Sequence, residues 1–109
     1  DGPYEIFIDI KKVKDLYSFD VSSNEMKFGS QLTLKTLIDK FNSNASTSGY
    51  EYLSEIANHI SKIANRAVRN TGTWAGNLAM KHAHLEFPSD VFICFETVGA
   101  MITLFDSNK

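Results

Sequence analysis

The residues best suited to hold a ligand lie in the stretch 69–78, which reads Arg-Asn-Thr-Gly-Thr-Trp-Ala-Gly-Asn-Leu. Gly72 and Gly76 lack a Cβ and tolerate positive φ, so backbone at these positions can approach a ligand closely. Thr73 and Asn77 add short side-chain donors and acceptors. Together they predict a loop whose amides face an anion or a cofactor. The alternative is a tight helix-to-strand connection in which the glycines only relieve steric crowding.

Two other groups of residues could do chemistry. Arg69 could bind a phosphate or could brace the loop by donating to backbone carbonyls. His82, His84 and Glu86 occupy alternate positions, so on a strand they would share one face and could offer three ligands to zinc or iron. We favour an exposed linker for this segment. His59 lies beside apolar helix positions and is typical of a hydrogen-bonded boundary histidine rather than a catalytic base.

The remaining distinctive side chains favour packing over chemistry. Trp74 could stack on a cofactor ring, but packing on a neighbouring helix is the preferred interpretation. Phe87, Phe92 and Phe95 are expected in the core. Cys94 is the only cysteine and lies in an apolar run, which predicts a buried, unreactive thiol. The sequence contains no pattern typical of acyl or phosphoryl transfer.

The composition is that of one soluble globular domain. The chain has 109 residues, of which 43% are hydrophobic and 22% charged. A net charge of -2 with dispersed basic residues argues against nucleic acid as a partner. The sequence has neither an apolar stretch long enough for a membrane span nor a signal pattern, so we expect no membrane partner and a cytoplasmic location.

The first half of the chain predicts two strands followed by a helix. Alternation over 4–10 and 24–29 indicates strands, and the short polar connection suggests that they pair with each other. From Thr33, a candidate cap, the period becomes helical, and the apolar stripe consists of Leu34, Leu37, Ile38 and Phe41. Residues 42–49 lack periodicity and predict a surface loop.

The second half predicts two more helices and a last strand. Helical spacing runs from about Tyr50 to Arg66. Pro88, Ser89 and Asp90 can start another helix that Gly99 would end, and we prefer this helix to a buried strand over 91–95. Residues 100–105 indicate a strand. This order predicts an α+β fold in which a small mixed or antiparallel sheet packs with helices.

The stretch 69–78, together with the later Pro88-Ser89-Asp90 and its hydrophobic sequel, resembles the flavin-binding domain of molybdenum hydroxylases. This family includes xanthine dehydrogenases and aldehyde oxidases, and the resemblance runs from Ile6 to about Leu104. The linker 81–90 is similar to that of animal aldehyde oxidases, particularly insect ones. The resemblance implies that residues 1–109 form part of an FAD-binding domain. It also implies that a glycine-rich pyrophosphate segment upstream and a closing segment downstream are absent from the chain.

The resemblance also implies a set of cofactor-binding residues. Thr73, Gly76 and Asn77 match family positions that line the flavin, and Asp90 matches an acidic position near the cofactor. Ile63 stands where an aromatic residue of some relatives packs on the adenine. Oriented N–H donors near N1 and O2 would raise the electron affinity of a flavin. No catalytic residue and no metal ligand is expected in this segment.

The family reaction sets the remaining expectations. The resemblance implies hydroxylation at a molybdopterin centre, with electrons passing through two [2Fe-2S] clusters to FAD and then to dioxygen or NAD. The molybdopterin and the clusters would lie in other domains of a homodimeric parent enzyme, and the chain alone is expected to bind FAD weakly or not at all. The alternatives are a non-catalytic interaction domain and the FAD subunit of an enzyme that resembles carbon monoxide dehydrogenase.

Overall fold

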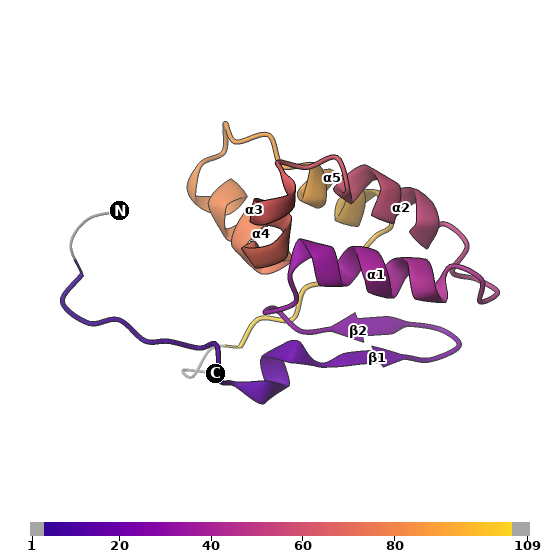
Figure 1. Cartoon of the computed structure of the whole chain (residues 1–109), viewed down its shortest axis with the longest axis horizontal. Coiled ribbons are helices and arrows are strands. Elements are labelled where there is room, and N and C mark those ends of the chain that lie inside the picture. Colours follow the sequence, from indigo (N-terminus) through magenta and orange to yellow (C-terminus); the bar gives the residue numbers. More distant parts are fainter. Residues whose placement is uncertain (1–3, 106–109) are drawn as a thin grey trace.

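The computed structural model of the chain describes residues 4–105, which contain five α-helices and a two-stranded antiparallel sheet. In chain order the elements are a 3-10 helix (Lys14–Tyr17), β1 (Phe19–Val21), β2 (Met26–Phe28), α1 (Leu34–Asn44), α2 (Leu53–Ile60), α3 (Arg66–Thr71), α4 (Trp74–Ala83) and α5 (Asp90–Thr97). Figure 1 shows the helices on one side of the β hairpin. The predicted α+β class is confirmed.

The hairpin forms between neighbouring residues of the chain. Phe19 lies opposite Phe28, and the turn is closed by the Ser22 amide, which donates to the Glu25 carbonyl at 2.8 Å. The Ser22 hydroxyl in turn accepts from the Glu25 amide at 3.1 Å. The second predicted strand is therefore confirmed as β2. Its partner, however, is β1, and the prediction that it pairs with residues 4–10 is wrong.

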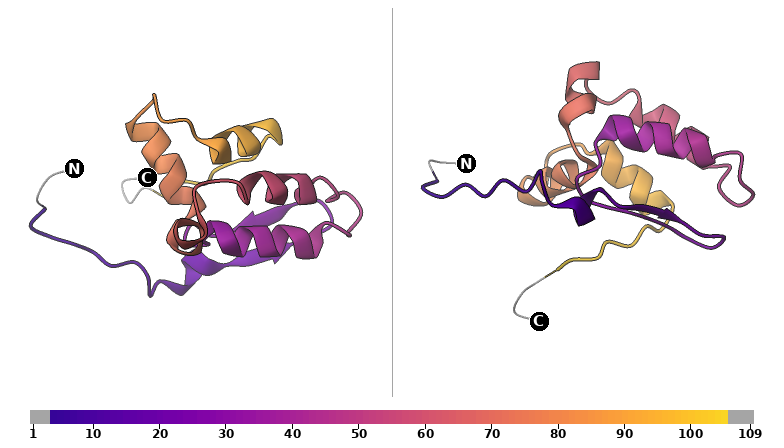
Figure 2. Two further views of the ribbon diagram at one scale, coloured as in Figure 1. Left: turned by 45° about the horizontal axis from the view of Figure 1, so that its top comes forward. Right: turned by 60° about the horizontal axis from the view of Figure 1, so that its bottom comes forward.

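The predicted N-terminal strand is absent from the described residues. Residues 4–10 form neither helix nor strand, and Ile6, Phe7 and Ile8 are each at least 80% exposed. An alternating pattern becomes a strand only when another strand pairs with its backbone, and β1 takes that place because a four-residue turn delivers it directly to β2. Figure 2 shows both terminal segments extending away from the helices in different directions.

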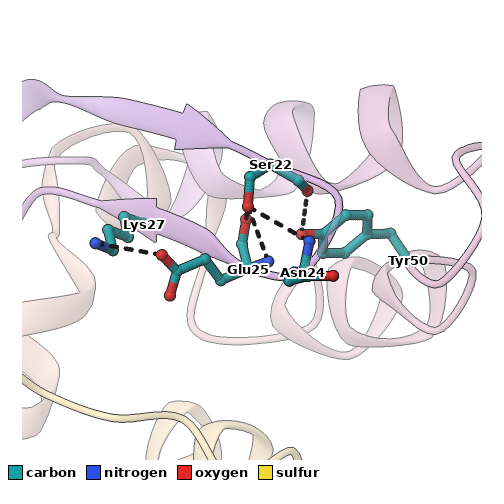
Figure 3. Close-up of polar contacts among 5 residues, drawn as sticks. All are labelled: Ser22, Asn24, Glu25, Lys27 and Tyr50. Atoms are coloured by element: carbon teal, nitrogen blue, oxygen red, sulfur yellow. Dashed lines mark hydrogen bonds and ion pairs between the residues drawn. The ribbon is translucent and has the colours of Figure 1, made fainter.

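Tyr50, between α1 and α2, ties the hairpin turn to the helical layer. Its hydroxyl donates to the Ser22 carbonyl at 2.7 Å (Figure 3). Glu25 forms an exposed ion pair with Lys27, at 3.3 Å. Tyr50 is only 5% exposed, and burial, with smaller contributions from Tyr52 and Glu25, raises the pKa of its phenol. The hairpin turn is therefore fixed both by its own backbone hydrogen bond, from Ser22 to Glu25, and by the hydrogen bond from Tyr50.

Helix α1 begins at the predicted cap. The Thr33 hydroxyl accepts from the Thr36 amide at 3.1 Å, and the buried face of the helix consists of Leu34, Leu37 and Phe41. The helix extends to Asn44, which corrects the predicted loop from residue 42. The side chains of Ser43 and Asn44 donate to the carbonyls of Asp39 and Lys40, one turn earlier in the same helix.

The single helix predicted over 50–66 is in fact interrupted. Helix α2 ends at Ile60, and Ala64 has a φ of 51°, a left-handed value that a helix cannot contain. Asn65 then caps α3, because its side chain accepts from the Val68 amide at 3.0 Å. The apolar spacing continues across this break, so periodicity alone did not reveal it.

Helix α5 confirms the prediction of a helix capped by Ser89 over that of a strand. Gly99 ends it with a φ of 67°, and the Ala100 amide donates to the Phe95 carbonyl at 2.9 Å. The strand predicted over 100–105 is not formed. Met101 and Phe105 are 95% and 94% exposed, because no described strand pairs with this segment.

Aromatic side chains from the hairpin and the helices meet in the core. The Phe28 ring lies 5.5 Å from Trp74, 5.9 Å from Phe95 and 5.8 Å from Phe41. The Trp74 Nε1 donates to the Gly29 carbonyl at 2.8 Å. The prediction that Trp74 packs rather than stacks on a cofactor is therefore confirmed.

The expected core cluster of three phenylalanines is wrong for two of its members. Phe95 is buried together with Val91, four residues earlier on the same face of α5. Phe92 faces outward and is 40% exposed, and Phe87 is half-buried before the helix begins. Only one face of a helix can turn toward the core. The prediction of a three-phenylalanine cluster did not take this into account.

Candidate functional site

The predicted glycine loop is the short turn that connects α3 with α4. Thr73 caps α4: its hydroxyl accepts from the Gly76 amide at 3.0 Å, and its carbonyl accepts from the Asn77 amide at 3.2 Å. The Trp74 amide donates to the Leu32 carbonyl at 3.4 Å. The expectation of amides open to a ligand is therefore wrong for residues 74, 76 and 77. A threonine that precedes an apolar helix start is itself a cap signal, and it outweighs the glycines.

The glycines of this turn relieve crowding, as the alternative interpretation expected, but the turn leads into a helix and not into a strand. A Cβ on Gly72 would lie 2.9 Å from the Val68 carbonyl oxygen. A Cβ on Gly76 would lie 3.1 Å from the capping hydroxyl of Thr73. Gly76 itself is exposed, so the first turn of α4 presents bare backbone to solvent.

A backbone bridge joins the starts of α1 and α4. Thr33 pairs with Thr73 in antiparallel fashion, and the Leu34 amide donates to the Gly72 carbonyl at 2.9 Å. Both threonines are helix N-caps, so the positive ends of two helix dipoles lie next to each other. The bridge joins positions 40 residues apart, which sequence spacing could not indicate.

Asn77 connects α4 with the start of α5. Its Oδ1 accepts from the Ser89 hydroxyl at 2.5 Å, and the same hydroxyl accepts from the Phe92 amide at 3.0 Å as the cap of α5. Ser89 is only 3% exposed. The sequence indicated Ser89 as a possible cap, but nothing in it pointed to a partner 12 residues earlier.

Asp90 follows directly and occupies the first turn of α5, where a carboxylate is favoured by the helix dipole. Its side chain is 53% exposed and its Oδ1 lies 3.9 Å from Nε2 of His59 on α2. This contact agrees with the expectation of a boundary histidine.

Partial burial and the Asp90 carboxylate raise the pKa of the free Cys94 thiol, which lowers its reactive thiolate fraction.

Arg69 and Ile63 form a separate contact. The Arg69 Nη1 donates to the Ile63 carbonyl at 2.7 Å, which agrees with the second of the two roles considered for Arg69, a bracing bond to a backbone carbonyl. The Ile63 side chain is half-buried against the core. No hydrogen bond or ion pair within residues 4–105 joins either residue to Asn77, Ser89 or Asp90.

Thr73, Gly76 and Asn77 therefore lie together at the start of α4, and Asn77 contacts Ser89 at the start of α5, which we call the junction. Asp90 follows Ser89 in the chain, and its side chain lies next to His59 on α2. Ile63 lies outside the junction, on the turn after α2. The polar groups at the junction suit a flavin: the Asn77 amide nitrogen is a donor without a partner in the described chain, and the Asp90 carboxylate is an exposed acceptor. Such groups match the carbonyl and hydroxyl groups along a flavin's polar edge.

The two best-defined cavities lie elsewhere, beside β2. Their volumes are about 260 Å³ and 680 Å³, and both are lined by Met26, Phe28, Phe95 and Ala100. Neither is lined by Thr73, Gly76, Asn77 or Asp90. Neither of these two cavities therefore forms part of the junction.

The structure does not support the alternative metal site. His82 lies in the last turn of α4 and His84 follows the helix, so with Glu86 they do not share a strand face. In the part of the chain that the structure describes, no three His, Cys, Asp or Glu side chains are placed to hold a metal ion. Over the same residues, none of the helices combines the length and the apolar character that crossing a membrane requires.

Comparison with known proteins assigns the chain to a family. Residues 2–109 match the family described as FAD binding domain in molybdopterin dehydrogenase. An indole-3-acetaldehyde oxidase of Arabidopsis thaliana is 33% identical over 106 residues, which cover 97% of this chain and 8% of the relative. An abscisic-aldehyde oxidase of the same plant is 29% identical over the same shares. An indole-3-acetaldehyde oxidase of Zea mays is 29% identical over 97% of this chain and 7% of the relative.

The chain thus spans less than a tenth of the length of these relatives. The match extends through α3, α4 and α5 and so includes the whole junction. On this basis the chain belongs to the family of FAD-binding domains of molybdopterin dehydrogenases, whose matched relatives are aldehyde oxidases.

Proposed function

We propose that this chain is the flavin-contacting part of a larger molybdenum hydroxylase of the aldehyde oxidase type. The observation that carries this proposal is the family match over residues 2–109. Bound FAD would take electrons from [2Fe-2S] clusters and pass them to dioxygen or NAD. The clusters and the molybdopterin lie in other domains of a homodimeric, cytoplasmic enzyme.

The residues of the junction bind and orient the cofactor and do no covalent or acid–base chemistry. Asn77 donates from its carboxamide to an acceptor atom on the flavin. Asp90 accepts from a hydroxyl of the ribityl chain or the ribose. Thr73 caps the start of α4 and Gly76 is exposed there, so the positive end of the helix dipole would favour the negative charge that a flavin gains on reduction, although the amides of residues 74, 76 and 77 are used within the chain. Ile63 lies outside the junction, on the turn after α2, and would offer the adenine only an aliphatic contact where some relatives have an aromatic ring.

The likeness to known enzymes carries this conclusion, and the chemistry of the junction agrees with it. The match rests on sequence. The geometry shows that the Asn77 amide nitrogen has no partner within residues 4–105 and that the Asp90 carboxylate is exposed. The chain spans less than a tenth of the length of its relatives, so other parts of the parent protein can contribute to the FAD site. FAD binding is therefore best measured in the full-length protein.

The test is the flavin content of the full-length protein. We expect the blue absorbance of oxidised flavin and a stoichiometric release of FAD on denaturation. Replacing Asn77 by alanine removes the donor and is expected to lower FAD affinity about fivefold to tenfold, because one hydrogen bond is lost. Leu104→Ala is the matched control, since this side chain is 86% exposed and far along the chain from the junction.

A full-length protein without flavin absorbance under all preparation conditions would contradict the proposal and favour the non-catalytic interaction domain. Flavin absorbance with equal affinities in the wild type and Asn77→Ala would keep the flavin but remove Asn77 from its site.

A further inference from the structure

Ser89 is a buried polar side chain whose hydroxyl accepts one hydrogen bond and donates another. It is 3% exposed, and its oxygen accepts from the Phe92 amide at 3.0 Å. A hydroxyl has one proton to donate, and here the proton points to Asn77 Oδ1, at 2.5 Å. Ser89 therefore does more than cap α5: it fixes the side of the Asn77 carboxamide on which the oxygen lies.

The orientation of Asn77 follows from this contact. A carboxamide is planar, so an oxygen held by Ser89 directs the NH₂ group away from it. The Asn77 nitrogen has no hydrogen bond within residues 4–105. In the same part of the chain no side-chain nitrogen or oxygen is buried without a partner, so this nitrogen reaches solvent. Two N–H donors are thus presented at the junction in a defined direction.

We propose that Ser89 is a positioning residue for flavin binding and that it acts through Asn77. Without the hydroxyl, the carboxamide can rotate and present its oxygen, an acceptor, where a donor is needed. Ser89 itself touches no flavin atom, and the loss of its hydroxyl is felt at the flavin only while Asn77 is present. This inference rests on the proposed function, and it adds a residue to the site that lies behind the contacting surface.

The first test needs no flavin. The side-chain NH₂ signals of Asn77 are followed by NMR in the chain labelled with ¹⁵N-asparagine. Ser89→Ala is expected to shift both signals, whereas Ser89→Thr keeps a hydroxyl and should restore the wild-type positions. Thr33→Ala is the control: it removes the hydroxyl cap of another helix, α1, and within residues 4–105 that hydroxyl forms hydrogen bonds only with Thr36. Unchanged Asn77 signals in Ser89→Ala would overturn the proposal.

The second test is a double-mutant cycle on FAD affinity in the full-length protein. Ser89→Ala and Asn77→Ala are each expected to weaken binding about fivefold to tenfold, and the double variant should bind no more weakly than Asn77→Ala alone. Ser89→Thr should bind as the wild type does. A double variant whose loss is the product of the two single losses would show that Ser89 acts independently of Asn77 and would overturn the proposal.

The two tests also separate this inference from the proposed function. A wild-type protein that binds no FAD contradicts the proposed function, and the positioning role in flavin binding is then overturned with it. The NMR signals still report, in that case, whether Ser89 orients Asn77. A wild-type protein that binds FAD, with affinity unchanged in Ser89→Ala, contradicts the positioning role alone.

Discussion

The junction of α4 and α5 and the two terminal segments 4–10 and 101–105 represent opposite extremes of this molecule. At the junction, Thr73 and Ser89 each cap a helix with a side-chain hydroxyl, and Asn77 links the two helices. In the terminal segments, apolar side chains such as Phe7 and Met101 are more than 80% exposed, and no ladder forms. The segments have a strand-like sequence, yet they are not strands.

The difference shows which local signals suffice on their own. A helix satisfies its backbone within one segment, so a cap and an apolar stripe define it without outside help. A strand satisfies its backbone only through a neighbour. The apolar pattern of residues 101–105 is therefore typical of a strand, but no strand within the described residues pairs with this segment.

The largest expected difference in unfolding free energy is between two leucine-to-alanine substitutions, one in the core and one in a terminal segment. Leu37 is fully buried in α1, whereas Leu104 is 86% exposed. Leu37→Ala is expected to cost about 2 to 5 kcal/mol of unfolding free energy, because it leaves a cavity in the core. Leu104→Ala should change it by less than about 0.5 kcal/mol. Urea unfolding measures both, and similar losses would show that residues 101–105 pack in solution.

A smaller effect should separate two threonines. Thr73→Ala removes the cap of α4 and is expected to cost about 1 to 2 kcal/mol. Thr103→Ala in the exposed C-terminal segment should be neutral within about 0.5 kcal/mol. Thermal unfolding compares them. If Thr73→Ala were equally neutral, the capping hydrogen bond at the junction would have little weight.

The smallest effect concerns the hairpin turn, which is fixed by Tyr50. Tyr50→Phe removes the hydrogen bond to the Ser22 carbonyl and should cost about 1 kcal/mol at neutral pH. The phenol has a pKa above its ordinary value in the folded chain, so the folded state keeps its proton longer than the unfolded state. The contribution of Tyr50 is therefore complete below about pH 10 and is lost as the pH rises further.

Unfolding measured from pH 8 to pH 11 tests this expectation, with the exposed Tyr52→Phe as the control. The wild type and Tyr52→Phe should lose stability more steeply above about pH 10 than Tyr50→Phe does. Equal slopes in all three proteins would contradict the assignment of the raised pKa to Tyr50.

Much of the helical structure could be predicted because its signals are local. Thr33 and Ser89 stand before apolar helical spacing, and both are caps in the structure. The break at Ala64 was missed because the apolar spacing continues across it, although Asn65 is a residue typical of a cap. The strand over 4–10 was predicted wrongly because alternation does not reveal whether a partner exists.

Candidate residues of the site could be named from the sequence, but their local structure and contacts could not. The family resemblance indicated Thr73, Gly76, Asn77 and Asp90. The structure places the first three together at the start of α4 and places Asp90 next to Ser89, which contacts Asn77. It also shows that α4 begins where a loop was expected, because a threonine cap and a following apolar residue start a helix even when it includes a glycine. The contact between Ser89 and Asn77 depends on how two helices meet, and no spacing in the sequence encodes it.

The most direct test of the account is hydrogen–deuterium exchange of the full-length protein with and without FAD. If the junction contacts the flavin, peptides that cover residues 73–90 should become protected when FAD is bound, while those that cover 4–10 should exchange at the same rate in both states. Protection confined to other parts of the protein, with residues 73–90 unchanged, would contradict the central claim that this junction holds the cofactor.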